Sequence, residues 1–138
     1  MADFERSFKC KEFDGEELKH IQTFSPDIVV GRLSENVSLK DCENNEWMNT
    51  YGKFLKACGR VDTKYIITTG FWKSEVVDVQ IRKLSIENKW KLVELGDLGD
   101  NPTMRAEGEF WHTGVALHPG DIGMHAIADR IYEAVLNL

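Results

Sequence analysis

Apolar residues along the chain follow two alternating patterns, which predict strands and helices in turn. Compact apolar runs bounded by turn-forming residues predict strands at residues 27–33, 65–69 and 90–95. In the segments before, between and after these runs, apolar residues recur every three or four positions, which is typical of helices packed on one side. The four helical stripes are Leu18, Ile21 and Phe24; Trp47, Met48, Tyr51, Phe54, Leu55 and Cys58; Val77, Ile81 and Leu84; and Met124, Ile127, Ala128, Ile131, Val135 and Leu138.

Capping and turn residues stand at the ends of these predicted helices. Asp14 and Glu17 have the spacing of a capping box before the first helix, and Pro26 ends that helix. Gly59 is placed to cap the end of the second helix, and Ser74 to cap the start of the third. Strands that alternate with helices in this way predict an α/β fold with a parallel sheet and right-handed crossovers.

Candidate site residues, polar or aromatic, follow each predicted strand. They lie at residues 34–36, 70–72 and 96–97, and His118 stands in the loop before the last helix. Ligands of open parallel sheets bind at the carboxyl ends of the strands, so we expect these residues to meet at one edge. A histidine and an asparagine there suit acyl transfer, because an imidazole moves protons and an amide N–H stabilises a developing oxyanion.

The loop at residues 118–124 is the most informative stretch of the chain. Pro119 fixes its own φ angle, two glycines permit tight backbone geometry, and Asp121 stands where the last helix should begin. This pattern predicts that His118 is held rigidly just before an amphipathic helix, as a catalytic histidine would be.

Three stretches together resemble one family, the SGNH or GDSL-type hydrolases, which are esterases and acylhydrolases. They are residues 26–37 with Asn36, residues 69–72 with Trp72, and residues 114–131 with His118. The resemblance implies a three-layer, flavodoxin-like parallel sheet and catalysis without a cofactor. It implies that His118 is the general base, that Asn36 belongs to the oxyanion hole, and that the substrate is a small acyl ester or an acetylated carbohydrate.

The chain also departs from the family pattern. The Gly-Asp-Ser block that supplies the nucleophile is absent from the sequence, Ser34 replaces a glycine, and Val115 replaces the acid three residues before the histidine. The resemblance therefore implies that residues 1–138 form a single, partial domain truncated to about three strands. Alone, that domain should be inactive. Glu109, Asp97, Asp100 or a backbone carbonyl could take the place of the missing acid and orient the histidine.

Several other residues are candidates for a pocket. Ser34 lies at a strand end, but it lacks the surroundings of a nucleophilic serine. Glu35 is expected to be a charge at the edge of the sheet rather than an acid catalyst. Trp72, with Phe110 and Trp111, could line an acyl or sugar pocket or simply belong to the core.

The metal-binding residue types are not arranged as a metal site. Gaps of six and seven residues separate His112, His118 and His125, and do not bring their rings together on one helix, so no metal ion is expected. The cysteines are odd in number and lack CxxC spacing, which predicts reduced, partly buried thiols. They are Cys10, Cys42 and Cys58.

Composition excludes some classes of partner. The chain has 138 residues with a net charge of −6, which disfavours binding to nucleic acid or to anionic lipid. No apolar run approaches the roughly 20 residues of a membrane-spanning helix, and the first residues lack a secretion signal. We therefore expect a cytoplasmic protein without a nucleic-acid or membrane partner.

The strand at residues 28–33 should be a bare edge if the family's first two strands are missing. Exposed hydrophobic edges recruit partners or aggregate. We expect either a homodimer or the binding of a separate N-terminal fragment through this strand. Two functions remain open: the base-bearing part of a serine esterase, and a catalytically inactive binding or oligomerisation module on the same scaffold.

Overall fold

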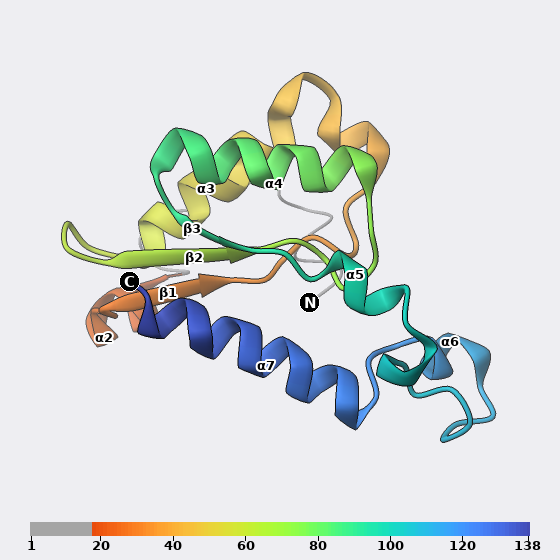
Figure 1. Ribbon diagram of the computed structural model, residues 1–138. Coiled ribbons are helices and arrows are strands. Elements are labelled where there is room, and N and C mark those ends of the chain that lie inside the picture. Colours follow the sequence, from red (N-terminus) through yellow and green to blue (C-terminus); the bar gives the residue numbers. More distant parts are fainter. Residues whose placement is uncertain (1–17) are drawn as a thin grey trace.

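A three-stranded parallel sheet lies between helices on both of its faces in the computed structural model, which describes residues 18–138 (Figure 1). The strands are β1 (Ile28–Gly31), β2 (Lys64–Thr68) and β3 (Lys91–Val93), in the order β1-β2-β3. The helices are α2 (Lys19–Phe24), α3 (Glu46–Cys58), α4 (Glu75–Asn88), α5 (Gly96–Gly99), α6 (Thr113–Ala116) and α7 (Asp121–Leu136), with 3-10 turns at Leu39–Asn45 and Pro102–Met104. The α/β class, the three parallel strands and the flanking helices predicted from the sequence are thus confirmed.

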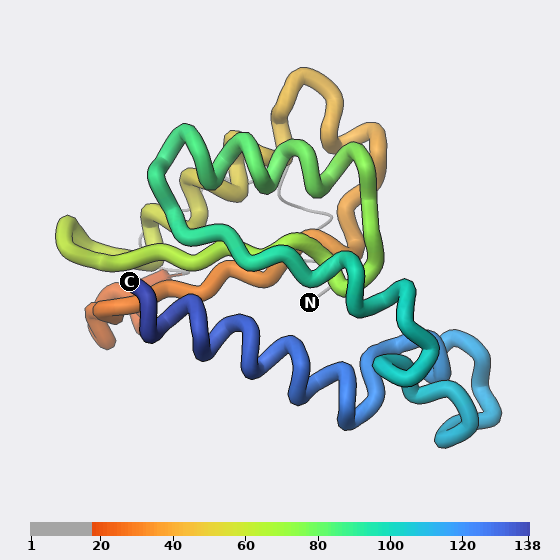
Figure 2. Tube along the Cα trace, viewed as in Figure 1, coloured from red at the N-terminus to blue at the C-terminus, as the bar shows by residue number. Residues whose placement is uncertain are grey.

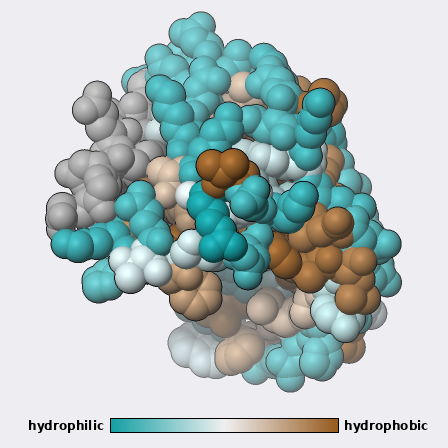
Figure 3. All heavy atoms as spheres, turned by 90° about the vertical axis from the view of Figure 1, so that its left-hand side faces the viewer, coloured by the Kyte–Doolittle hydropathy of each residue, from teal (hydrophilic) through white to brown (hydrophobic). Residues whose placement is uncertain are grey.

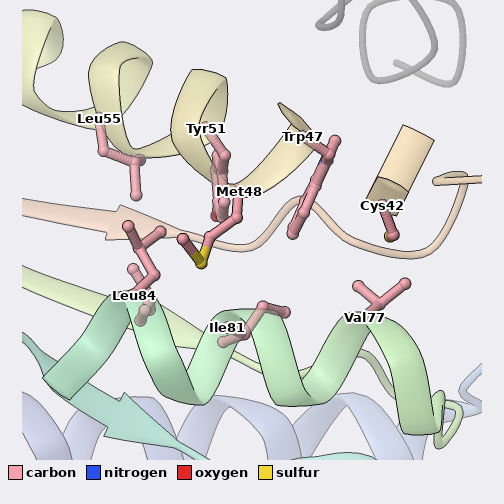
Figure 4. Close-up of a cluster of buried hydrophobic side chains, with 9 residues drawn as sticks. Cys42, Trp47, Met48, Tyr51, Leu55, Val77, Ile81 and Leu84 are labelled. Atoms are coloured by element: carbon pink, nitrogen blue, oxygen red, sulfur yellow. The ribbon is translucent and has the colours of Figure 1, made fainter. Parts of the chain in front are cut away.

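The helices α3 and α4 share one face of the sheet. The buried side chains of α3 point across to those of α4 (Figure 4), and Trp47 stacks on Tyr51 with 5.0 Å between ring centroids. Both helices carry the apolar stripes predicted from the sequence, because each stripe has the sheet and a second helix to pack against.

Among the helices of residues 18–138, α7 covers the opposite face of the sheet (Figure 1) and packs on β2 and β3. Ile66 of β2 is completely buried under this helix. Val30 of β1, its register partner on the same face, is 42% exposed. The cover on this face therefore ends before it reaches β1.

The first and last predicted stripes are only partly buried, which corrects the sequence analysis. In α2, Phe24 is 81% exposed. The predicted capping box of this helix, Asp14 and Glu17, lies outside the described residues. In α7, Met124 and Leu138 are exposed, whereas Gly123 and Ala134 are buried. No second described helix packs along the outer side of α7, and α2 contacts α3 only near its edge, so the buried part of each helix is narrower than its apolar stripe.

The predicted cap residues are found at the predicted places. The Ser74 hydroxyl accepts a hydrogen bond from the N–H of Val77 at the start of α4. Gly59 caps α3 in an extended conformation and not a left-handed one, and a Cβ there would overlap the Tyr65 hydroxyl. Gly59 is therefore required for close packing against β2 rather than for a positive φ angle.

None of the helices in the described part of the chain is long and apolar enough to cross a lipid bilayer.

Candidate functional site

The loops that follow β1 and β2 are joined at the carboxyl edge of the sheet. Glu35 accepts a hydrogen bond from the N–H of Phe71 at 3.0 Å and pairs with Arg32 at 3.2 Å. Ser34 is buried next to Gly70, where an added Cβ would lie 3.3 Å from the Ser34 hydroxyl oxygen. The expectation that these loops meet at one edge is confirmed.

Trp72 is fixed in the loop after β2 by contacts on several sides. Its ring meets Phe71 edge to face at 5.1 Å, and the Arg105 guanidinium lies over it at 5.4 Å. Arg105 also donates to the carbonyl of Gly99 at 3.0 Å, and the N–H of Gly99 donates to the carbonyl of Phe71 at 3.1 Å. These hydrogen bonds join the loops after β2 and β3, and Arg105 and Phe71 from these loops hold the indole of Trp72 in place.

The backbone of the His118 loop is bonded to the segment before it. The N–H of Ala106 donates to the carbonyl of His118 at 2.9 Å, and the N–H of Gly120 donates to the carbonyl of Met104 at 2.9 Å. A Cβ at Gly123 would overlap the Met104 carbonyl oxygen, so only glycine permits this approach. Figure 2 shows this segment beyond the end of the sheet, next to the start of α7. Two backbone hydrogen bonds thus hold the loop that carries His118 against the preceding segment, and its rigidity stays a prediction.

His118 and Trp72 line one small hollow. Its volume is about 220 Å³, and Gly114 and Leu117 complete the lining. The His118 side chain is exposed, so its imidazole is open to a proton-bearing group in the hollow. The structure thus places Trp72 and His118 together, although they are far apart in the sequence.

Two of the acids considered as orienting partners for His118 are engaged elsewhere. Asp97 forms a two-bond ion pair with Arg130, at 2.5 and 2.6 Å, and this pairing lowers the pKa of Asp97 below its ordinary value. Asp100 pairs with Lys73. Within residues 18–138, no carboxylate lies within ion-pair distance of the His118 imidazole, and Val115, three residues before His118, is exposed.

The remaining predicted site residues lie around this edge of the sheet without joining the hollow. Asn36 is exposed in the turn directly after Glu35, and Asp121 is exposed in the first turn of α7. Glu109 is exposed in the segment before α6. Phe110 and Trp111 are exposed as well, and the residues that line the hollow with Trp72 do not include them.

No group of three or more metal-ligating side chains is arranged to hold a metal ion in the described residues. Cys42 and Cys58 are free and buried, and burial raises the pKa of both thiols. Cys10 lies outside the described residues.

Sequence reasoning missed the residues that support the hollow. Arg105 acts through its guanidinium, which lies over Trp72 and donates to the Gly99 carbonyl, and Gly99 and the two glycines of the 118–124 loop act through backbone contacts; none of these leaves a periodic signal. The sequence indicates that the two glycines permit tight backbone geometry. It does not indicate that they lie against the backbone carbonyl groups of Arg105 and Met104. Helix α6, which carries Gly114, is too short to show a helical repeat.

Comparisons of the chain with models of protein families, with curated proteins and with solved structures found no match.

Proposed function

We propose that this chain is the base-bearing portion of a serine esterase of the SGNH type. In this proposal the fold is a flavodoxin-like sheet and the protein is cytoplasmic. His118 is the general base, Asn36 donates to the oxyanion, and a segment outside this sequence supplies the nucleophilic serine. The substrate is a small acyl ester or an acetylated carbohydrate, and no cofactor takes part.

The observation that carries the proposal is the joint position of His118 and Trp72. An exposed imidazole lies on a backbone held by two hydrogen bonds, and it lines a hollow with an indole fixed by Arg105 and Phe71. A rigidly presented base beside a small, mostly apolar hollow suits the binding of a short acyl group. Asn36, in the turn after β1, belongs to the same edge of the sheet.

The residues would act in two half-reactions. The serine oxygen attacks the ester carbonyl carbon while its proton passes to the His118 imidazole, and the Asn36 amide donates to the oxyanion. The carbon–oxygen bond to the alcohol then breaks, and the alcohol leaves with the proton held by His118. A water molecule attacks the acyl-serine in the same way, with His118 again taking and returning the proton, which releases the acid and free serine.

A second candidate function is a catalytically inactive binding or oligomerisation module. The specific observation in its favour is that Asp97 and Asp100 are paired with cations and that no described carboxylate reaches His118. In serine triads that acid fixes the tautomer of the imidazole and stabilises its charged form. A scaffold that has lost both the acid and the serine would keep only its binding surfaces.

Active-site labelling distinguishes the two functions. The chain is expressed alone, and also extended by the in-frame coding sequence immediately upstream of Met1, and both are treated with a fluorophosphonate. The esterase proposal expects covalent labelling and hydrolysis of p-nitrophenyl acetate by the extended chain only. An upstream sequence without a Gly-Asp-Ser block, or an extended chain that folds but is neither labelled nor active, overturns the esterase proposal and favours the inactive module.

A further inference from the structure

The Glu35 carboxylate joins the turn after β1 to the segment after β2. One of its oxygens, Oε1, accepts hydrogen bonds from the N–H of Phe71 at 3.0 Å and from the Arg32 guanidinium at 3.2 Å. Phe71 is completely buried, and its carbonyl accepts a hydrogen bond from the N–H of Gly99 in α5. Glu35 therefore connects the exposed turn after β1 to a residue that is itself held by the core and by the segment after β3.

The turn after β1 lies in an irregular part of the chain. Residues 32–38 form no helix or strand, so side-chain contacts contribute much of what holds this backbone in place. Ser34 and Glu35 lie against Gly70, where an added Cβ would be 3.3 Å from the Ser34 hydroxyl oxygen and 3.5 Å from Cγ of Glu35. The loops after β1 and β2 are therefore in contact, and the hydrogen bond from Phe71 to Glu35 fixes how they are aligned.

We propose that Glu35 is a positioning residue that holds Asn36 in place relative to Trp72. The inference rests on the proposed function, in which Asn36 donates to the oxyanion and Trp72 lines the hollow for the acyl group. Asn36 directly follows Glu35, and Trp72 directly follows Phe71. The hydrogen bond between Glu35 and Phe71 thus joins the two chain segments at the positions next to these side chains. Glu35 acts through Asn36 and not by contact with the substrate.

Such a link affects the reaction because an oxyanion donor stabilises the transition state only at the right distance. The donor must lie about 2.7–3.1 Å from the developing oxyanion, and a displacement of about 1 Å can cost about a hundredfold in rate. Arg32 contributes as well, because its positive charge offsets the negative charge of Glu35. A carboxylate without this partner would oppose the negative charge that develops at the oxyanion.

Nuclear magnetic resonance relaxation of the chain alone tests the positioning without any catalysis. Backbone order parameters are about 0.85 in rigid segments and below about 0.6 in flexible ones. We expect the order parameter of the Asn36 amide to fall towards the flexible range in Glu35→Ala. It should stay near the wild-type value in Glu35→Gln, because the glutamine keeps an acceptor oxygen for the N–H of Phe71.

Glu87→Ala is the matched control for the loss of one glutamate. Glu87 is exposed in the last turn of α4, at the end of the molecule that faces the viewer in Figure 3 and opposite the loops after β1 and β2. This variant should leave the order parameter of Asn36 unchanged. A wild-type Asn36 that is already flexible, or one whose order parameter is the same in Glu35→Ala, overturns the proposal.

Kinetics of the upstream-extended chain test the consequence for the reaction. Glu35→Ala should lower kcat for p-nitrophenyl acetate by about tenfold to a hundredfold, counted per site titrated with the fluorophosphonate, and should leave KM within about twofold. Glu35→Gln should restore most of kcat. A merely structural role of Glu35 would lower the number of titratable sites and not the rate per site.

The outcomes separate this inference from the proposed function. A labelled, active extended chain whose kcat is unchanged in Glu35→Ala overturns the positioning role and leaves the proposed function standing. An extended chain that folds but is not labelled overturns the proposed function, and with it the part of Glu35 in the reaction. The order parameters of the chain alone decide separately whether Glu35 holds Asn36 in place.

Discussion

The N–H of Ala106 donates a hydrogen bond of 2.9 Å to the carbonyl of His118, so the backbone of the candidate base is anchored to a segment outside its own loop. Together with the bond from Gly120 to Met104, it leaves the imidazole exposed on a fixed backbone. A positioned proton acceptor requires this combination. The anchoring can be tested separately from the chemistry.

Gly123→Ala should destabilise the fold. The new Cβ would overlap the Met104 carbonyl oxygen, which is a backbone atom and cannot turn away, so the start of α7 must shift. Overpacking of this kind costs about 1–3 kcal/mol of unfolding free energy. Urea denaturation measures the change, with Gly114→Ala as the control, because its Cβ would meet only the exposed side chain of His112. Equal stabilities of the two variants would contradict the described packing.

Glu35→Ala should loosen the link between the loops after β1 and β2. The variant leaves the N–H of Phe71 without its acceptor, and we expect a loss of about 1 kcal/mol, since the carboxylate is partly exposed. Glu35→Gln keeps an acceptor oxygen and should restore most of that stability. Amide hydrogen exchange at Phe71 gives the local measurement. It should accelerate in the alanine variant and stay near the wild-type rate in the glutamine variant; unchanged exchange in both would show that the link does not form.

The ion pair between Asp97 and Arg130 should make stability depend on acid pH. Because the pairing lowers the pKa of Asp97 in the folded state, its contribution is fully present above the unfolded value of 3.8. The contribution is lost as the pH falls through the lower, folded pKa. Asp97→Asn should therefore have a lower unfolding free energy than wild type at neutral pH. The difference in unfolding free energy between the two proteins should shrink below about pH 4. Urea unfolding between neutral and acid pH measures it.

Asp129→Asn, at an exposed position on α7 without an ion pair in the described residues, is the control for removing one negative charge. If the difference in unfolding free energy between wild type and Asp97→Asn stays constant as the pH falls through the acid range, the ion pair does not stabilise the fold.

The sequence predicted those parts of the fold where local pattern and packing agree. Ser74 caps α4 as expected, and the apolar positions of α3 are buried except Phe54, which is partly buried, because the sheet and α4 cover most of this helix face. Met124 was wrongly placed in a buried stripe, since the spacing of apolar residues does not show how wide the neighbouring surface is.

The sequence does not predict the contacts that join distant parts of the chain at the candidate site. The meeting of the strand-end loops followed from topology, but the contact of Arg105 with Trp72 joins residues far apart in the chain. The engagement of Asp97 by Arg130 likewise depends on how α7 crosses the sheet. These contacts arise from the packing of whole elements and not from local propensity.

The most direct test of the central claim is the rate of p-nitrophenyl acetate hydrolysis by the upstream-extended chain before and after His118→Ala. General-base catalysis contributes about 10²–10⁴-fold, so the account predicts a loss within or beyond that range. The His118 side chain is exposed, and the substitution should leave the unfolding free energy nearly unchanged. His125→Ala, at another exposed histidine, should keep the full rate. An extended chain that hydrolyses the ester equally well without His118 would contradict the role proposed for this residue.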